Sequence, residues 1–552
     1  MIHLESATRL TVYRVLATTA LLLFFTAPFL SAQLSGTYTI GGYKANYPSI
    51  SAAVAALNAK GVSGSVIFSI RPGAYEEQFV LGPVSGASNY NTITFRSSTG
   101  NADDVVVRYA PAPYEGEYVV RFDNARHFRL VNLTLESIHS VYVGVIKVVN
   151  QAHDLRIEGC KLLAPELVSA VEERSVVYLN PSVANSVRIH DNIIRGGAYG
   201  ISFFMSPGAY SAGTQISNNQ ISFYYHTGVY IANLRGGSFT GNKIDGSNNI
   251  PDTALGLRIV GWSGTTASPV LIANNFINVR HGNKRAAGIS NSNNIQFFHN
   301  SLRQVSDGAV MVLSQVQGAA VLNNIFRAST GYAVYVLNSS DVHMDYNDLY
   351  TGGPYLARLN SKLAANLYYW RLYSGYDQRS ISVEPRFVST YDLHARSTSL
   401  IGAGVAVAGV AIDIDRQPRA NPPCIGADEF ASYIKGGTWF GKATVQAVQS
   451  GSDLWEGNSG ATDNLFGGTL ADRSVFPNPV SDALQVVLTD VYTGPVTLTV
   501  VDGLGRRISS LNYDKDGRDF RAELAVQHLV PGVYQLQITE GRDVAVERFV
   551  KR

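Results

Sequence analysis

Two short segments of the chain gather charged side chains that could bind an anion. The segment DGSNNIPD supplies carboxylates at Asp245 and Asp252, and RHGNKR places four basic-type residues within six positions, at Arg280, His281, Lys284 and Arg285. Guanidinium and ammonium groups so close together could bind a uronate, sulfate or phosphate group. The simpler interpretation is that the two segments pair their charges with each other, which contributes little at a surface. Both interpretations stay open from the sequence.

Catalytic and metal-binding patterns are weaker. Asp103 and Asp104 are adjacent in an expected turn, and adjacent strand residues face opposite ways, so we expect a solvated pair and no joint acid/base role. The two cysteines form no CxxC or Cys/His pattern with zinc-ligand spacing. Asp341, Asp345 and Asp348 in DVHMDYND lack the spacing of a calcium loop and are interpreted as an exposed turn. We predict no catalytic residue, no metal and no cofactor.

The elements that must position these segments repeat along the chain. A short turn recurs with apolar residues three positions before and two positions after its anchor residue, and successive anchors lie 32, 27, 23, 33, 25, 24 and 23 residues apart. The anchors are Cys160, Asn192, Asn219, Asn242, Asn275, Asn300, Asn324 and Asn347. A second short strand opens about eight residues after most anchors, for example GVYI at Gly228 and GIS at Gly288, so each repeat reads strand, turn, strand, loop.

Units of this length with only short strands cannot make strand–helix–strand crossovers, and they predict a parallel β-helix whose coils stack about 4.8 Å apart. We expect the anchor asparagines to adopt the left-handed conformation and to hydrogen-bond to stacked copies of themselves. The interval after Asn242 and after Asn275 is lengthened to fourteen and thirteen residues, so both charged segments should project side by side from neighbouring coils. Three positions after the anchors an outward polar strip is expected, formed by Arg195, Ser222, Asp245, Asn278, Arg303 and Arg327.

Both ends of the rod need covers, because unpaired strand edges are exposed there. At the N-terminus Ser49 precedes apolar residues at helical spacing, Ile50, Ala53, Val54 and Leu57, and Gly61 stops this short helix. Near the other end Trp370 is expected to pack on the last coil from a second short helix. Cys160 lies in an early coil and Cys424 in the closing cap, at least seven coils away, so they should stay unpaired, more than about 30 Å apart.

The segments TYTIGG, PSISAAVAAL and IRPGAYEEQ resemble the opening of pectin-lyase-like β-helix proteins, and AIDIDRQPRANPPCIGADEF resembles the closing cap of secreted right-handed β-helix proteins. The resemblance spans roughly residues 36 to 430 and implies the architecture, an all-β right-handed parallel β-helix. It does not extend to activity. The aspartate and arginine motifs of pectin methylesterases and the carboxylate motifs of polygalacturonases are absent from the sequence.

The two ends of the chain indicate export. Arg9 and Arg14 precede an apolar run that is too short to span a membrane, and small residues lead to a cleavage site expected between Ala32 and Gln33. We therefore predict a signal peptide over residues 1–32, the β-helix with its caps over 33–432, a Gly/Ser-rich linker over 433–473 and a small antiparallel β-sandwich over 474–552.

The last of these segments resembles the C-terminal sorting domain of type IX secretion cargo, through its FPNP opening, its GVYQLQI strand and its terminal RFVKR. The resemblance implies a bacterium of the Bacteroidota type, passage through the periplasm, removal of the domain near the linker, and release or attachment at the cell surface. An ordinary adhesive immunoglobulin-like module is the alternative. The positions that match the sorting pattern are Pro477, Asn478, Pro479, Gly532, Tyr534, Arg548 and Lys551, expected to act in recognition and folding.

The charge composition of the chain limits the classes of partner that it can bind. The chain carries 44 Lys and Arg against 42 Asp and Glu, a net charge of +2, which gives no electrostatic basis for binding nucleic acid or an anionic membrane. We expect an extracellular or outer-membrane surface protein without a transmembrane segment, whose partners are the type IX secretion machinery and a polysaccharide or surface glycan. Its expected role is non-catalytic recognition or adhesion; the alternative is a lyase, hydrolase or esterase acting on an acidic polysaccharide.

Overall fold

The computed structural model describes residues 32–112, 116–246, 255–280, 285–430, 472–476, 480–489, 493–502, 507–516, 519–541 and 543–552. The chain divides into two compact units, Met1–Ala443 and Thr444–Arg552. No helix in the described part of the chain has the length and apolarity needed to cross a membrane. The predicted signal peptide lies outside the described residues apart from Ala32, which with Gln33 is exposed just before the first strand.

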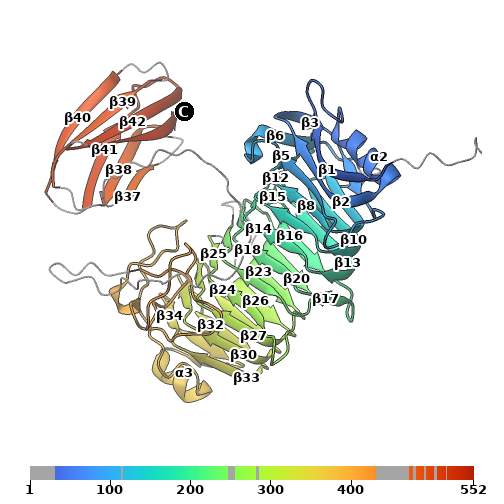
Figure 1. Ribbon diagram of the computed structural model, residues 1–552. Coiled ribbons are helices and arrows are strands. Elements are labelled where there is room, and N and C mark those ends of the chain that lie inside the picture. The colour runs from blue at the N-terminus through green and yellow to red at the C-terminus, as the bar shows by residue number, and fades with distance from the viewer. Residues whose placement is uncertain are drawn as a thin grey trace, which may run out of the picture. The chain divides into compact units, whose positions relative to one another are not determined.

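The first unit is the predicted right-handed parallel β-helix, in which three parallel sheets wind around one apolar core (Figure 1). Each full coil contributes three strands, one more than the repeat predicted, because the anchor turn separates the strand before it from the strand after it. We call the three sheets A, B and C. Sheet A, before the anchor turn, contains β1 (Leu34–Ile40), β2 (Val62–Ile70), β5 (Ile93–Ser97), β8 (Phe128–Val131), β11 (Arg156–Glu158), β14 (Arg188–His190), β18 (Gln215–Ser217), β21 (Ser238–Thr240), β24 (Val270–Ala273), β27 (Asn293–Phe298), β30 (Gln317–Leu322) and β33 (Ser340–Asp345).

Sheets B and C follow the turn in each coil. Sheet B contains β3 (Gly73–Glu76), β6 (Val105–Tyr109), β9 (Thr134–Ser137), β12 (Lys161–Glu166), β15 (Ile193–Gly197), β19 (Gln220–Ser222), β22 (Lys243–Asp245), β25 (Phe276–Val279), β28 (Ser301–Gln304), β31 (Ile325–Ala328) and β34 (Asp348–Thr351). Sheet C contains β4 (Phe79–Leu81), β7 (Val120–Arg126), β10 (Ile146–His153), β13 (Ser175–Asn185), β16 (Tyr199–Phe204), β20 (Thr227–Ala232), β23 (Leu255–Val260), β26 (Arg285–Ser290), β29 (Met311–Ser314), β32 (Val334–Leu337), β35 (Ala357–Leu359) and β36 (Lys362–Ala364), with β17 (Tyr210–Ala212) beside β13.

The core follows the predicted apolar columns. Ile189 and Ile216 pair on sheet A, Ile244 and Ile277 pair on sheet B, and all four are buried in one cluster. Burying each such side chain contributes about 1.5–3 kcal/mol relative to its exposure. Because like residues stack on like in every coil, this contribution repeats along the whole rod.

The anchor asparagines form a continuous buried ladder. From Asn192 to Asn324 each anchor donates to the Oδ1 of the next anchor from both its backbone N–H and its Nδ2, the latter at 2.8–3.2 Å. The ladder begins at Cys160, whose N–H donates to Asn192, and ends where Asn347 donates to Asp377. The left-handed conformation is adopted by the residue before the anchor and not, as predicted, by the anchor itself. Examples are Asp191 (φ 54°), Asn274 (φ 56°) and His299 (φ 52°). The turn needs the positive φ there, which frees the anchor amide for the ladder.

The two covers contain the predicted helices. Helix α2 (Ile50–Lys60) has Ser49 as its N-cap, ends at Gly61 with φ 65°, and buries the four predicted apolar residues. Helix α3 (Leu367–Ser374) buries Trp370 while Tyr368 and Tyr369 stay exposed. Three short 3-10 turns, η1 (Ala102–Asp104), η2 (Glu172–Arg174) and η3 (Thr398–Leu400), complete the described helical elements.

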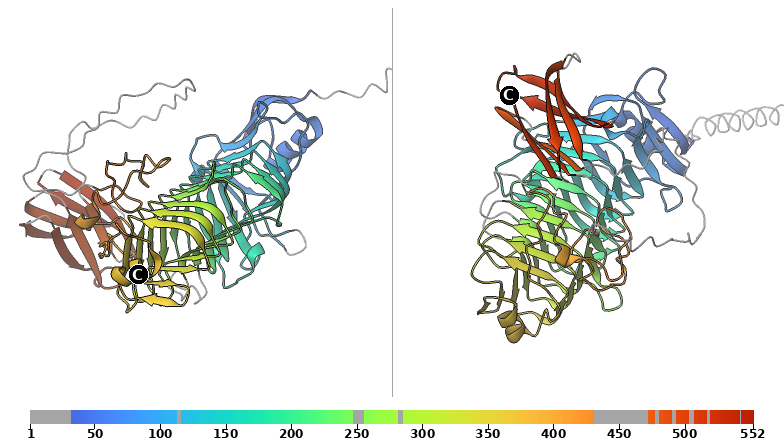
Figure 2. Two further views of the ribbon diagram at one scale, coloured as in Figure 1. Left: turned by 90° about the horizontal axis from the view of Figure 1, so that it is seen from below. Right: turned by 90° about the vertical axis from the view of Figure 1, so that its left-hand side faces the viewer.

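Residues 377–430, which we call the return segment, run back along the coils and do not cap the rod's end (Figure 2). Ile381 pairs with Asp348, Thr390 accepts a hydrogen bond from Asn278 at 2.6 Å, and Arg416 pairs with Asp191 at 2.8 Å. These three contacts, taken in chain order along the return segment, lie on successively earlier coils of the β-helix. Asp345 and Asp348 are therefore buried beneath this segment, and the expectation of an exposed turn is wrong for them.

The course of the return segment also places Cys424 on an earlier coil than the sequence predicted. It lies beside Asn323, because the neighbouring Gly426 N–H donates to the Asn323 carbonyl at 2.8 Å. The coil of Asn324 is six anchors along the ladder from Cys160, about 29 Å at the usual coil spacing, where the sequence predicted at least seven coils. Both cysteines are free and buried, and burial raises the pKa of each thiol to about 12.

The second unit contains two antiparallel sheets, in the strand orders β37-β38-β41 and β40-β39-β42-β43. The strands are β37 (Asp472–Phe476), β38 (Ala483–Thr489), β39 (Gly494–Val501), β40 (Arg507–Lys515), β41 (Asp519–Ala525), β42 (Gly532–Glu540) and β43 (Asp543–Lys551). They enclose their own apolar core. Antiparallel strands with alternating burial form the small sandwich that the turn pattern predicts.

Candidate functional site

The predicted ligand-binding residues lie where the chain passes from sheet B to sheet C in two adjacent coils. Asp245 pairs with Asn278 across β22 and β25, and Leu255 pairs with Arg285 across β23 and β26, so both lengthened intervals begin and end on neighbouring strands. Asp252, His281 and Lys284 lie outside the described residues. The corner separates two faces of the rod, and the described candidates are divided between them.

On the sheet B face, Asp245 and Arg280 pair with each other. The Arg280 guanidinium donates from Nε and Nη2 to the two carboxylate oxygens, at 3.0 and 2.9 Å, and it lies 4.2 Å from the centre of the Tyr391 ring. Burial raises the pKa of Asp245, although Arg280 opposes this. The charge pairing that the sequence allowed is therefore present here, in a partly buried and bidentate geometry.

The polar strip of sheet B is in register but is covered in part. Ser222, Asp245, Asn278, Arg303 and Arg327 occupy successive paired positions. The return segment lies against this strip through Thr390 on Asn278 and Glu384 on Arg327. A hollow of about 180 Å³ remains between them, lined by Lys243, Ile244, Asp245, Phe276, Asn278, Tyr391, Asp392, Leu393 and His394.

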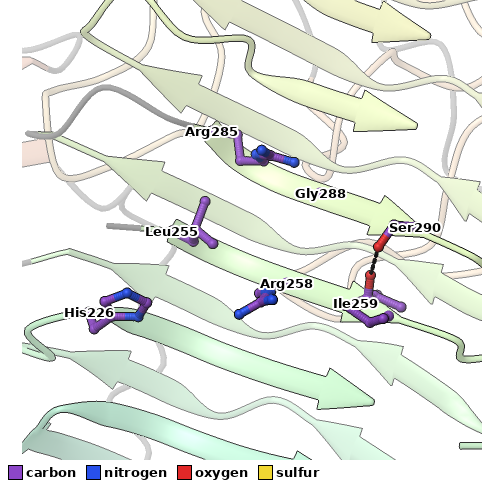
Figure 3. A pocket seen from close by; sticks show the side chains of 8 residues that line it. His226, Leu255, Arg258, Ile259, Arg285, Gly288 and Ser290 are labelled. Carbon is purple, nitrogen blue, oxygen red and sulfur yellow. Dashed lines mark hydrogen bonds between the residues drawn. The ribbon is translucent and has the colours of Figure 1, made fainter. Parts of the chain in front are cut away.

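The larger hollow opens on the outer face of sheet C and measures about 350 Å³ (Figure 3). It is lined by His226, Leu255, Arg258, Ile259, Val260, Arg285, Gly288 and Ser290. Strands β20, β23 and β26 position it, since the outward column of these strands reads Tyr230, Arg258, Gly288 in register. Because Gly288 has no side chain, it leaves the space that its neighbours in the column fill.

Gly288 also sets the position of Arg285. A Cβ at residue 288 would lie 2.7 Å from the Arg285 Cδ, so the arginine side chain lies across the glycine in Figure 3 and a larger residue would displace it. Two coils of sheet C thus present two guanidinium groups to one hollow. Arg258 is held from the other side, 4.6 Å from the centre of the Tyr230 ring.

The electrostatics of this hollow favour an anion. Burial lowers the pKa of Arg285, and repulsion from Arg258 lowers it further. Within the described residues neither guanidinium forms an ion pair, and no carboxylate lines the hollow. We call the two side chains and the space between them the arginine hollow.

Acidic and phenolic groups lie near the rim of the arginine hollow, on the preceding coils. Burial raises the pKa of Glu172, and Arg258 lowers it in part. Burial raises the pKa of Tyr199 to about 12, and the Tyr199 ring lies 5.0 Å from the His226 ring. A carboxyl and a phenol, groups that can donate or accept a proton, thus lie at one side of the arginine pair.

Sequence reasoning identified Arg285 but missed Arg258, Tyr230 and Gly288. The segments GVYI and GLRI place Tyr230 and Arg258 at the same position, so the column was visible. Gly288 was aligned with Gly256, whereas the register pairs it with Arg258, two residues further on. Of the two tyrosines beside His226, Tyr224 is buried and Tyr225 is half-buried, and both lie in the loop between β19 and β20.

In the second unit, the described residues that match the sorting pattern lie on the last two strands. Gly532 opens β42, and Tyr534 is buried, stacks on Phe549 at 5.6 Å and donates to the Val530 carbonyl at 3.0 Å. Arg548 pairs with Gln535 in the ladder, and Lys551 is buried at the end of β43. Pro477, Asn478 and Pro479 lie outside the described residues.

Comparison with known families matches residues 474–552 to the family described as "Secretion system C-terminal sorting domain" and residues 168–358 to "Periplasmic copper-binding protein (NosD)". The chain therefore combines a parallel β-helix, part of which matches the NosD family model, with a C-terminal region that matches the secretion sorting domain. It is a secreted or cell-surface protein. None of the curated proteins matches it.

Three solved structures are similar to parts of this chain. The Dettilon tailspike protein gp208 is 12% identical with a TM-score of 0.40, over 55% of this chain and 58% of the tailspike. The A-module of the Azotobacter vinelandii mannuronan C-5 epimerase AlgE6 is 13% identical with a TM-score of 0.36, over 61% of this chain and 95% of the module. A mutant of the periplasmic alginate epimerase AlgG is 11% identical with a TM-score of 0.35, over 63% and 84% of the two chains. The chain spans little more than half of the tailspike's length.

Proposed function

We propose that the β-helix is a non-catalytic recognition module that binds an acidic polysaccharide in the arginine hollow. The observation that carries this proposal is the pair of guanidinium groups, Arg258 and Arg285, directed into one hollow of about 350 Å³ whose described lining residues include no carboxylate. Sites for small ligands measure about 300–1,000 Å³, so the hollow can hold one or two charged sugar units.

Anion binding in the arginine hollow is favourable because it relieves the repulsion between the two guanidinium groups. Two like charges at neighbouring positions destabilise each other, and an anion bound between them removes that cost while it gains charge-assisted hydrogen bonds. Uronate and sulfate groups have the planar or forked oxygens that guanidinium groups bind in pairs. Asp252, His281 and Lys284 lie on the same corner in the sequence, and we keep them as predicted contacts of the same ligand. Asp245 and Arg280 bind each other, and we propose for them a supporting role.

The experiment is retention of the purified chain on immobilised polygalacturonate and alginate, with dextran as a neutral comparison. The wild-type chain should be retained on the acidic polymers only. The double variant Arg258→Gln/Arg285→Gln should lose at least tenfold in affinity. Arg358→Gln is the matched control, because Arg358 lies over Tyr335 in the same column of sheet C, at 4.7 Å, but outside the hollow. Equal retention of the wild-type chain on dextran, or an unchanged affinity of the double variant for the acidic polymers, would contradict the proposal.

An enzyme acting on an acidic polysaccharide is the second candidate, and Glu172 favours it. A lyase needs a proton acceptor and a cation beside a uronate carboxylate, and the raised pKa of Glu172 next to Arg258 offers both. Lyase products are unsaturated and absorb in the ultraviolet. Absorbance that rises with the wild type and stops with Glu172→Gln would replace the recognition proposal by this one.

We further propose that type IX secretion machinery recognises the sorting domain of a Bacteroidota-type bacterium and that the exported β-helix stays at the outer surface or is released. The match of residues 474–552 to a secretion sorting family supports the first part.

A further inference from the structure

A group of charged side chains in the return segment has the geometry of a metal site. Ligand atoms of His394, Asp415 and Asp428 all lie within 4.8 Å of one another. The three residues come from stretches separated by 21 and 13 positions in the sequence, so the fold, and not a local loop, brings them together. The group lies beside the hollow of sheet B, whose lining includes His394.

Asp428 is the residue that points to a missing ligand. Its side chain belongs to a residue only 8% exposed, and among the described residues it accepts no hydrogen bond and joins no ion pair. A buried carboxylate without a partner is costly, and such groups in proteins are paired or bind a cation. One of its oxygens lies within 4.8 Å of ligand atoms of both His394 and Asp415.

The histidine is oriented as metal-binding histidines are. Its Nδ1 is in short hydrogen-bond contact with Asp392, and its Nε2 faces Asp415 at 2.6 Å. A carboxylate on one ring nitrogen fixes the imidazole so that the other nitrogen can bind a cation. The cation would replace the hydrogen that now lies between Nε2 and Asp415.

A further carboxylate holds the two aspartate-bearing stretches in place. Asp413 accepts hydrogen bonds from the backbone N–H of Asp415 and Gln417, at 2.9 and 2.7 Å, and from that of Glu429 at 2.9 Å. The Ile414 N–H donates to the Ala427 carbonyl at 2.9 Å. The positions of Asp415 and Asp428 are thus fixed before any cation binds, which reduces the entropy cost of binding.

From this geometry we propose that His394, Asp415 and Asp428 bind one divalent transition-metal ion of the zinc type, with Asp392 as the positioning residue of the histidine. One imidazole with two carboxylates suits zinc, whereas calcium and magnesium prefer oxygen ligands alone. The ion ties three stretches of the return segment together on sheet B.

The test is titration of the full chain, stripped with a chelator, with ZnCl₂ alone, followed by calorimetry. One ion should bind per chain, and Asp428→Asn should weaken binding at least tenfold. Lys243→Met should strengthen it, because the Lys243 ammonium lies 3.4 Å from Asp415 and competes for that carboxylate. Asp341→Asn, at an exposed aspartate with φ 52°, is the matched control and should bind as the wild type does.

A second measurement does not depend on any variant. Co²⁺ bound to the wild-type chain should show visible absorption bands that one equivalent of Zn²⁺ abolishes. Absence of such bands together with absence of Zn²⁺ binding, or unchanged Zn²⁺ affinity in Asp428→Asn, overturns the proposal. Binding of Ca²⁺ that is as tight as that of Zn²⁺ and survives His394→Gln overturns the choice of metal.

Discussion

His299 shows how one residue in the turn column serves the return segment. It has a left-handed backbone, is fully buried, and lies between Asn274 and Asn323 in the equivalent positions of the adjacent coils. Its Nδ1 contacts the Gly426 carbonyl at 3.2 Å and its Nε2 contacts the Asn323 amide at 2.9 Å. Burial, together with the nearby Arg419 charge, holds the pKa of His299 well below 6.5. The histidine is therefore neutral in the folded chain.

This titration predicts a pH dependence. Below pH 6.5 the unfolded chain binds a proton at His299 that the folded chain does not, so the free energy of unfolding falls with decreasing pH, by about 1.4 kcal/mol per unit from this residue. His299→Asn, which suits the left-handed position, should make that slope shallower between pH 6.5 and 5. Urea unfolding of both chains at three pH values measures the difference. Identical slopes would contradict a neutral buried histidine.

At this scale the anchor column, the capping residues of α2 and the burial of Trp370 could be predicted from the sequence, because each depends on local spacing. The residue with positive φ could not be identified among neighbours of similar type, since Asn218–Asn219, Asn274–Asn275 and Asn323–Asn324 offer two asparagines each. Only the ladder decides which of the two amides faces inward.

The return segment is the element whose course the sequence did not predict. Its contacts with the coils join residues up to 225 positions apart, among them Val405 with Asn323 and Arg416 with Asp191. It forms no strand and no repeat, so no period reveals its direction, and its resemblance to a closing cap indicated only that the rod ends nearby. The arginine hollow was partly predictable, since its column repeats with the coils, whereas the His394 group depends entirely on this course.

Arg419 should hold the return segment to the coils. Its guanidinium is 4% exposed, donates to the Asn274 amide oxygen at 2.7 Å and to the Ala427 carbonyl at 2.9 Å, and pairs with Glu429 at 3.3 Å. Arg419→Met leaves the buried Glu429 charge unpaired, at a cost of about 3–5 kcal/mol. Hydrogen exchange should accelerate over residues 400–430 and stay unchanged in sheets A and C. Arg416 is an exposed partner of Asp191, so Arg416→Gln should leave hydrogen exchange unchanged both over residues 400–430 and in sheets A and C.

At the scale of the whole molecule, the chain combines a β-helix with its own core and a sorting domain with its own core. Since the cores are separate, deletion of residues 474–552 should leave the thermal midpoint of the β-helix unchanged while export stops and the product stays in the periplasm. Tyr534→Ala should also reduce export, because loss of a buried aromatic costs about 3–5 kcal/mol. Cell fractionation measures both, with the exposed Tyr90→Ala as control. Surface display of the deleted chain would contradict the sorting role.

The coil architecture of the β-helix could be predicted from the sequence, because the same period recurs along the chain and each copy supports the others. The ladder adds a property that no single coil has. Every inward amide donates toward the C-terminal coils and accepts from the N-terminal ones, so the amide dipoles add along the rod. The row of amides from Asn192 to Asn347 is thus electrically polar, and the Asp377 carboxyl oxygen meets the positive end of that row. A rod of this kind has a built-in terminus, and lengthening it would require moving Asp377 to the new last coil.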